Sequence, residues 1–360
     1  MATELGARAL GHLGWLVACD SQNPPRRPGG LVARLVEALR PGLEVEVSDL
    51  GEGCVCVYAR RGRPRLLFNV HVDTVPAAPG WQGDPFALRV EGGRAIGLGA
   101  CDVKGAAAAL LAALEASAPR DVALLFTTDE EAGQGRCVAE FCARGLPFEA
   151  VVVAEPTSLR AVVEHRGVGT ATGVFRGVAG HSSAASPGQS ALHAMVRWAH
   201  GALGHAEAAE GRGGVRFNLG VVEGGQKPNV VAAEARVRFG VRPPPGVDPA
   251  AVLGEFAALP GGEGAAFATN FVGPPLPPAG AAGLAGRARR AAEALGLPAG
   301  GPVDFWTEAA LFARAGYAAM VFGPGDIGRA HAPGEWVGLD ELAGAAETYA
   351  RLLRHEGPLS

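Results

Sequence analysis

Short apolar runs separated by polar loops recur along the chain, and several of these runs end at an acidic residue or a histidine. The clearest such runs are 66–70, 122–127, 151–154 and 318–322. Continuous Val, Leu and Ala runs of this length are typical of strands that are buried on both faces of a parallel sheet. The residues that follow them are His71, Asp129-Glu130-Glu131, Glu155 and, after a short loop, His331. Because open α/β sheets bind ligands beyond the carboxyl ends of their strands, we expect these side chains to share one crevice.

Segments with helical periodicity alternate with the strands. The pattern predicts helices over 5–17, 31–39, 106–114, 136–143, 281–295, 307–315 and 339–353, and further strands over 43–47 and 55–59. This alternation indicates an α/β fold with a mixed sheet flanked by helices.

The pattern changes after about residue 164, where longer strands with alternating burial take over. Strands are expected over 168–178, 215–222, 232–241 and 265–272, with helices over 190–203 and after Asp248-Pro249. The resulting βαββαβ order is that of a ferredoxin-like unit with an antiparallel sheet. We therefore predict a first part of the catalytic domain over 1–163, an inserted ferredoxin-like domain over 164–272, and the rest of the catalytic domain over 273–360.

Composition narrows the possible functions. The formal net charge of −4 leaves no basic surface of the kind that binds nucleic acid, and no run approaches the ~20 apolar residues of a membrane helix. The six cysteines form no C-x-x-C pair and no dense disulfide spacing, which indicates reduced thiols and a cytoplasmic protein. We thus expect a protein that acts on small molecules, with neither a nucleic acid nor a membrane as partner.

The residues at the strand ends indicate a metal site. Imidazoles and carboxylates without thiolates suit a pair of divalent ions such as zinc, which activate a water molecule. His71 and Asp73 lie two apart in an extended segment and point the same way, so the carboxylate can orient the imidazole. A simple structural His–Asp pair is the alternative. For Asp102, which begins a helix, position alone does not distinguish a capping role from metal bridging.

The triplet Asp129-Glu130-Glu131 is the strongest single signal. Three adjacent acids at the end of a buried strand repel one another unless cations compensate them, although an acidic turn in solvent is the simpler interpretation. Neighbouring glutamates can divide their roles, so that one binds metal while the other acts as the general base toward the reacting water.

Eight segments together resemble a known family. They are NVHVDTVP, GLGACDVKG, TTDEEAG, VAEPT, GVAGHSS, PNVVAAEARVRFGVR, DFWTEAALF and GPGDIGRAH. In this order they are similar to segments of the co-catalytic zinc amidohydrolases and exopeptidases, a family that includes acetylornithine deacetylase, succinyl-diaminopimelate desuccinylase and aminoacylases. The last two segments most resemble the deacetylases of acetylornithine and of acetylcitrulline.

The resemblance implies a role for each matching residue. It implies His71, Asp102 and Glu155 on one zinc ion, and Asp102, Glu131 and His331 on the other, with cobalt as an alternative metal. It further implies Glu130 as the general base, Asp73 as the partner of His71, and His181 as an oxyanion donor from a second subunit of a homodimer that the inserted lid domain holds together. The resemblance also implies Asn229 and Arg242 around the substrate carboxylate. Glu308 and Gly323 are further expected substrate contacts, and which of the acids Glu308, Asp304, Asp326 and Glu335 supplies charge beside the substrate side chain stays open.

The function implied by the resemblance is removal of an acetyl group from an Nα-acetyl amino acid, acetylcitrulline or acetylornithine, in arginine biosynthesis. Two alternatives stay open at this stage. A desuccinylase, aminoacylase or carboxypeptidase would use the same metal ligands with a different substrate pocket. A metal-binding protein without catalysis would be expected to lack Glu130 or a ligand, and the sequence retains them.

Overall fold

The computed structural model describes residues 3–131, 135–184, 186, 188–210 and 214–359, and it divides the chain into two compact units. The first unit comprises the residues up to Val163, Gly283–Pro302 and the residues from Thr307 onward. The second comprises Glu164–Ala282 and Val303–Trp306. The second unit thus extends past residue 272, where we expected the insertion to end.

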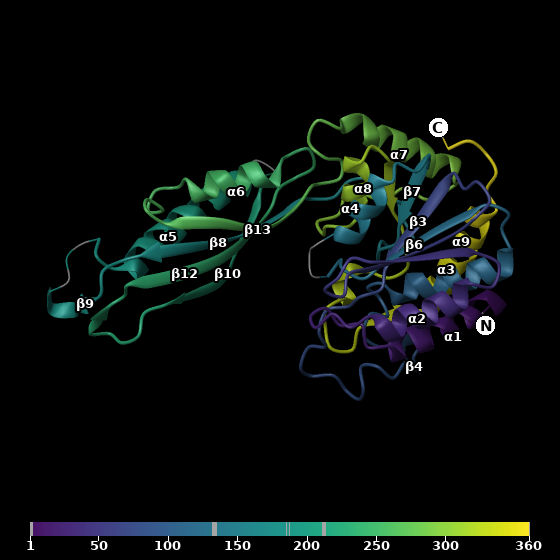
Figure 1. Cartoon of the computed structure of the whole chain (residues 1–360), viewed down its shortest axis with the longest axis horizontal. Helices are drawn as coiled ribbons and strands as arrows, with labels where there is room; N and C mark the ends of the chain where they lie inside the picture. The colour runs from purple at the N-terminus through teal and green to yellow at the C-terminus, as the bar shows by residue number, and fades with distance from the viewer. Residues whose placement is uncertain (1–2, 132–134, 185, 187, 211–213, 360) are drawn as a thin grey trace. The chain divides into compact units, whose positions relative to one another are not determined.

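A mixed six-stranded sheet forms the centre of the first unit, in the order β1-β2-β6-β3-β7-β14 (Figure 1). Its strands are β1 (Glu44–Asp49), β2 (Val55–Arg61), β3 (Leu66–His71), β6 (Val122–Thr127), β7 (Ala150–Val153) and β14 (Ala318–Val321). The strands from β6 to β14 pair in parallel, whereas β1 and β2 are antiparallel. The mixed α/β architecture predicted from the sequence is therefore confirmed.

Helices flank this sheet, and one of them begins just after Asp102. They are α1 (Glu4–Ala18), α2 (Gly29–Leu39), α3 (Lys104–Ser117), α4 (Arg136–Ala143), α7 (Ala282–Ala294), α8 (Ala309–Arg314) and α9 (Leu339–Leu353). The first ten residues of α3 are buried, and α3 packs against both α1 and α9. Its alanine-rich sequence allows this close packing, which anchors the helix that begins just after Asp102.

Three strands that the sequence analysis did not predict form a small separate sheet. They are β4 (Arg89–Glu91), β5 (Arg94–Ile96) and β15 (Trp336–Gly338), in the order β15-β5-β4. Strand β5 leads directly into the loop that carries Asp102, and β15 follows the loop that carries His331. The small sheet therefore joins the two segments that hold these residues.

The second unit is a four-stranded antiparallel sheet in the order β10-β12-β8-β13, with α5 and α6 packed on it (Figure 1). Its elements are β8 (Val168–Arg176), α5 (Ala191–Glu210), β10 (Arg216–Gly224), β12 (Glu234–Arg242), α6 (Pro249–Ala257) and β13 (Ala266–Gly273). This is the βαββαβ order expected from the sequence. Trp198 and Phe256 lie in its core, and Asp248 caps α6 by accepting a hydrogen bond from Ala250 N.

A two-stranded ribbon of β9 (Gly180–His181) and β11 (Val230–Val231) adds to the second unit, and two short 3-10 helices complete the secondary structure, η1 (Ser182–Ala184) and η2 (Ile327–Arg329). Among the described residues, no helix has both the length and the apolar character needed to cross a membrane.

Candidate metal centre

The carboxyl ends of the parallel strands bring the predicted residues together. His71 is the last residue of β3, Glu130 and Glu131 follow β6, and Glu155 follows β7. His331 comes from the loop after η2 and Asp102 from the loop before α3. These six residues belong to the first unit. The sheet topology therefore explains why residues more than 200 positions apart converge.

His71, Asp102 and Glu155 form one candidate ligand group, which we call the inner position. The Nε2 of His71 lies 3.1 Å from Asp102 Oδ1 and 3.6 Å from Glu155 Oε1. All three residues are buried, with at most 6% of their surface exposed. The inner position is thus shielded from solvent by the sheet and the loops around it.

Asp102, Glu131 and His331 form a second group, the outer position. The Nε2 of His331 lies 3.2 Å from Asp102 Oδ2 and 3.2 Å from Glu131 Oε1. The His331 side chain is 48% exposed, and its backbone adopts a left-handed conformation with φ of 57°. Asp102 contributes one oxygen to each group, so its carboxylate lies between the two positions.

The distances fit divalent metal ions. A tetrahedral ion with bonds of about 2.1 Å to nitrogen and oxygen separates its ligand atoms by about 3.4 Å. In each group the ligand atoms lie within 4.8 Å of one another, and the pairs that contact a histidine are 3.1 to 3.6 Å apart. Histidine and carboxylate donors without cysteine are suited to zinc and similar ions.

The electrostatics point the same way. Burial raises the pKa of Glu155 and of Glu130 well above the usual value, and neighbouring carboxylates add to the effect, while His71 opposes it. Hydrogen bonds to Asp102 and Glu131 raise the pKa of His331 to about 11. Protons on the histidines thus occupy the place that a cation would take, and metal binding at these groups would release protons.

Of the acidic triplet, only Glu131 belongs to a ligand group, and Glu130 lies beside it. It is partly exposed, and it lies close enough to His71 and Glu131 for their charges to shift its pKa in opposite directions. Asp129 points elsewhere: its Oδ2 accepts hydrogen bonds from Arg136 N at 2.6 Å and Cys137 N at 3.2 Å, at the start of α4. The triplet therefore offers one capping residue, one carboxylate outside both groups and one candidate metal ligand.

A buried network holds His71 in place. Its Nδ1 lies 3.2 Å from the carbonyl oxygen of Asp73 and 3.4 Å from Asp73 Oδ1. Asp73 Oδ2 in turn accepts hydrogen bonds from Asn23 Nδ2 at 2.8 Å and from Glu131 N at 3.1 Å. Sequence reasoning missed Asn23, whose only local signal is its position in a polar, proline-rich loop.

Glu308, an expected substrate contact, is held by hydrogen bonds from two strands. Its side chain is fully buried, and its Oε2 accepts hydrogen bonds from Asn69 Nδ2 at 2.6 Å and Thr127 Oγ1 at 2.9 Å. Burial, with the nearby charge of Asp129, raises the pKa of Glu308 to about 7. Glu308 thus supports β3 and β6 from behind, and a direct contact of its side chain with substrate remains a prediction.

Gly323 is also buried, and the space beside it explains why this position needs glycine. A Cβ atom there would lie 2.6 Å from the carbonyl oxygen of Glu155. Its amide donates a hydrogen bond to Thr157 Oγ1 at 3.1 Å. Gly323 thus lets the His331 loop approach the backbone of Glu155, and a direct substrate contact remains a prediction.

The other predicted substrate contacts lie in the second unit. His181 pairs with Val230 in the β9–β11 ribbon, and Ser182 N donates to Asn229 O at 3.1 Å, so His181 and Asn229 are neighbours. Both are exposed. Arg242 is the last residue of β12, whereas the ribbon immediately precedes the start of that strand. The nine residues of β12 place its two ends roughly 26 Å apart.

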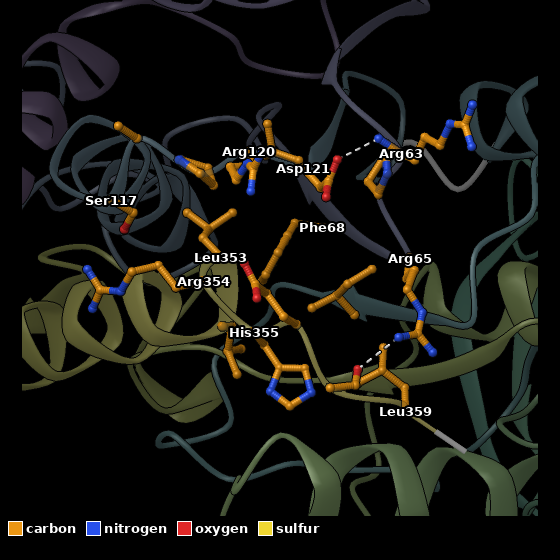
Figure 2. Close-up of a pocket in the computed structure, with 18 residues that line it drawn as sticks. Arg63, Arg65, Phe68, Ser117, Arg120, Asp121, Leu353, Arg354, His355 and Leu359 are labelled. Atoms are coloured by element: carbon orange, nitrogen blue, oxygen red, sulfur yellow. Dashed lines mark hydrogen bonds between the residues drawn. The ribbon is translucent and has the colours of Figure 1, made fainter.

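A cavity of about 640 Å³ in the first unit lies away from the ligand groups (Figure 2). Its lining includes Leu66 at the start of β3, Val122 at the start of β6 and Leu353 at the end of α9. Figure 2 shows Phe68 and Leu353 at its centre, with arginines around it. Because it opens at the amino ends of the strands, this cavity is not part of the candidate metal centre.

Comparisons with known proteins agree with this geometry. The model of Peptidase family M20/M25/M40 matches residues 67–355. The chain belongs to this family. It is also 48% identical to the N-acetyl-L-citrulline deacetylase of Xanthomonas campestris pv. campestris, over 98% of this chain and 99% of that protein.

Solved structures of the family have the same fold at low sequence identity. A metallo-carboxypeptidase from Sulfolobus solfataricus superposes with a TM-score of 0.75 at 18% identity, covering 96% of this chain and 98% of its own. A dinuclear metal-binding peptidase from Bacillus subtilis does so with a TM-score of 0.66 at 16% identity, covering 97% of each chain. These matches establish the fold for nearly the whole chain.

Proposed function

We propose that this protein is a metal-dependent hydrolase that removes the acetyl group from an Nα-acetyl amino acid, with N-acetyl-L-citrulline as the preferred substrate. The 48% identity to an N-acetyl-L-citrulline deacetylase over nearly the full length of both proteins carries this proposal. The two ligand groups and the adjacent Glu130 supply the chemistry that it requires. On this proposal the protein acts in arginine biosynthesis, in the cytoplasm.

His71, Asp102 and Glu155 would hold one divalent ion, and Asp102, Glu131 and His331 the other, with zinc as the expected metal and cobalt as a possible substitute. When bound, the ions polarise the amide carbonyl and make a water molecule more acidic. Glu130 takes a proton from that water as its oxygen attacks the carbonyl carbon. Glu130 then gives the proton to the nitrogen as the C–N bond breaks, and acetate and the free amino acid leave.

Asp73 would serve this reaction indirectly. Its contact with His71 Nδ1 favours the tautomer in which Nε2 carries no proton and can bind metal. Its second oxygen, bound by Asn23 and by the amide of Glu131, keeps the carboxylate from rotating. The two ligand groups are therefore aligned by a shared support before any substrate arrives.

We further propose that the active form is a homodimer in which His181 and Asn229 act on the partner's substrate. The positions of these residues within the second unit support this arrangement. His181 and Asn229 lie next to the start of β12 and Arg242 lies at its end, roughly 26 Å away. A small acyl amino acid cannot span that distance, so contact with all three residues requires two chains.

Kinetics on a panel of substrates test the proposed function. The value of kcat/KM should be highest for acetylcitrulline, lower for acetylornithine, and far lower for acetylmethionine, succinyl-diaminopimelate and a dipeptide. Metal content should be measured on the same samples. A clear preference for the succinyl substrate or the dipeptide would favour the desuccinylase or carboxypeptidase alternative, and a fully metallated protein without any hydrolysis would favour a non-catalytic role.

Mixing two inactive variants tests the role of the dimer. A His181→Ala chain combined with a Glu130→Gln chain forms hybrid dimers in which one of the two sites has both residues intact. Activity should reappear after subunit exchange. The matched control is the double variant, with both substitutions in one chain, taken through the same exchange with either single variant. No site of these hybrids has both residues intact, so no activity should appear. Absence of recovery despite verified exchange would exclude the action of His181 across the interface.

A further inference from the structure

The loop that carries Asp102 has no regular secondary structure, yet it is buried. Residues 97–103 lie between β5 and α3, and Leu98 to Val103 are buried. Buried backbone amides must find acceptors, because an unsatisfied one destabilises the fold by about 1–3 kcal/mol. The partners of these amides therefore determine the path of the loop and the position of Asp102.

One residue, Glu335, accepts hydrogen bonds from most of this loop. Its Oε2 accepts from Gly99 N at 2.9 Å, and its Oε1 accepts from Cys101 N and Asp102 N, both at 2.9 Å. Its carbonyl oxygen accepts from Gly97 N at 3.0 Å. The carboxylate is 2% exposed, and none of the ion pairs between described residues involves it. Amide groups of the loop thus provide its direct contacts.

Glu335 also belongs to the segment that carries the other outer ligand. It follows His331 by four residues and directly precedes β15, which pairs with β5. Carboxylate oxygens that accept from successive amides make strong, charge-assisted bonds with a narrow range of geometries. The Glu335 carboxylate therefore links the His331 segment to the backbone amide of Asp102 by a hydrogen bond.

We propose that Glu335 is a positioning residue that sets the place of the Asp102 carboxylate relative to His331 and so controls binding of the metal ion at the outer position. The inference rests on the proposed metal-dependent function but adds a residue that does not touch the ions or the substrate. Glu335 acts through the loop: if its carboxylate moves, the amide of Asp102 moves with it, and the carboxylate that serves both positions is displaced.

Glu335→Gln is the most informative variant. Glutamine can keep one oxygen on the amides of Cys101 and Asp102, but its NH2 group then faces Gly99 N, and two donors oppose each other. We expect the second equivalent of Co²⁺ to bind metal-free protein about 10- to 100-fold more weakly, with a changed visible absorption of the bound Co²⁺. Calorimetric titration with Co²⁺ and absorption spectra provide the two readouts.

Glu341→Gln is a matched control. Glu341 comes from the same region and is also a carboxylate that accepts a backbone amide, Gly338 N at 2.9 Å, while it pairs with Arg329. These contacts lie outside the Asp102 loop, so removal of the charge should lower the melting temperature without changing Co²⁺ affinity or the spectrum. A role of Glu335 in stability alone would give this same outcome for Glu335→Gln.

Glu335→Asp provides a second route should the glutamine variant fold poorly. Aspartate keeps the charge but is one methylene shorter, so it cannot reach all three amides, and we expect weakened Co²⁺ binding at the outer position here too. Wild-type affinity and spectrum in either folded variant would overturn the proposal. The titration uses no substrate, so a wrong assignment of the deacetylase activity leaves this test intact, whereas failure of the wild-type protein to bind Co²⁺ would refute the metal centre itself.

Discussion

The inner and outer positions share Asp102 but differ in how the fold supports them. At the inner position, His71 ends a strand that has hydrogen-bonded neighbours on both sides, and Asp73 fixes its Nδ1. At the outer position, His331 lies in a loop with half its side chain exposed, and among the described residues only its Nε2 has hydrogen-bond partners. Ligands that are already ordered lose little entropy on binding.

This difference indicates separate roles for the two positions. The inner group is preorganised by the sheet and should hold its ion tightly. The outer group relies on a loop conformation with positive φ, which is maintained by the surrounding contacts and not by the residue itself. We therefore expect the outer ion to exchange more readily. Substitutions in and around the two ligand groups should reveal this difference in how tightly the two ions are held.

Glu130→Gln should abolish most catalysis and leave metal binding at the inner and outer positions unchanged. Glu130 belongs to neither ligand group, so the variant should retain both metal ions while kcat falls by about 10²- to 10⁴-fold, as expected for the loss of a general base. Steady-state kinetics and elemental analysis on one preparation check this. Activity above about a tenth of wild type would contradict the assignment of the base.

His71→Ala and His331→Ala form a matched pair for the inner and outer positions. His331→Ala should keep one ion after dialysis and retain nearly the wild-type melting temperature, because its side chain is half exposed. His71→Ala removes a fully buried ring, so it should lose the tightly bound ion and destabilise the protein by about 2 kcal/mol. Equal metal retention and equal stability in the two variants would contradict the proposed difference.

Asp73→Asn should weaken the inner position more than the outer one. If the amide oxygen keeps its bonds to Asn23 and Glu131, the NH2 group faces His71 Nδ1 and favours a proton on Nε2, where metal binds. We expect about a 10- to 100-fold loss in affinity for the more tightly bound ion, measured by competition with a chelator. Asp84→Asn is the control. Asp84 lies in an exposed turn, where its Oδ1 accepts a hydrogen bond from Phe86 N, and this substitution should have no effect on affinity.

The sequence predicted those parts of the site that depend on periodicity. The buried strands β3, β6 and β7 were expected within one or two residues of their observed ends, so the residues that follow them could be placed at one edge of a sheet. Strands of three residues, such as β4 and β15, are too short to show any period, and they were missed.

The residues that support the ligands could not be predicted because their contacts are distant in the sequence. Asn23 reaches Asp73 across 50 positions, and Glu335 reaches Asp102 across 233 positions. Neither contact leaves a local pattern. The burial of Glu308 could not be predicted for a related reason: carboxylates usually lie at a surface, and its burial depends on donors from two strands, Asn69 and Thr127.

Glu308→Gln should leave turnover within about threefold of wild type and change only how stability depends on pH. Burial raises the pKa of Glu308 from 4.5 to about 7. On raising the pH, the unfolded chain therefore loses this proton first, the folded protein binds more protons between the two values, and stability falls across that range. Glu308 alone should contribute a loss of about 2 kcal/mol between pH 5 and pH 8 in the metal-free wild type.

Glutamine is neutral throughout and can still accept hydrogen bonds from Asn69 and Thr127, so stability of the Glu308→Gln variant should fall by about 2 kcal/mol less than that of wild type over this range. Denaturant unfolding of metal-free protein at several pH values measures the difference. Glu149→Gln is a control of opposite sign, because the hydrogen bond from Arg65 lowers the pKa of Glu149, and its stabilisation is lost only as the pH falls. If the free energy of unfolding changes with pH in the same way in wild type and Glu308→Gln, Glu308 is ionised in the folded protein. Asn69 and Thr127 would then bind a charged carboxylate.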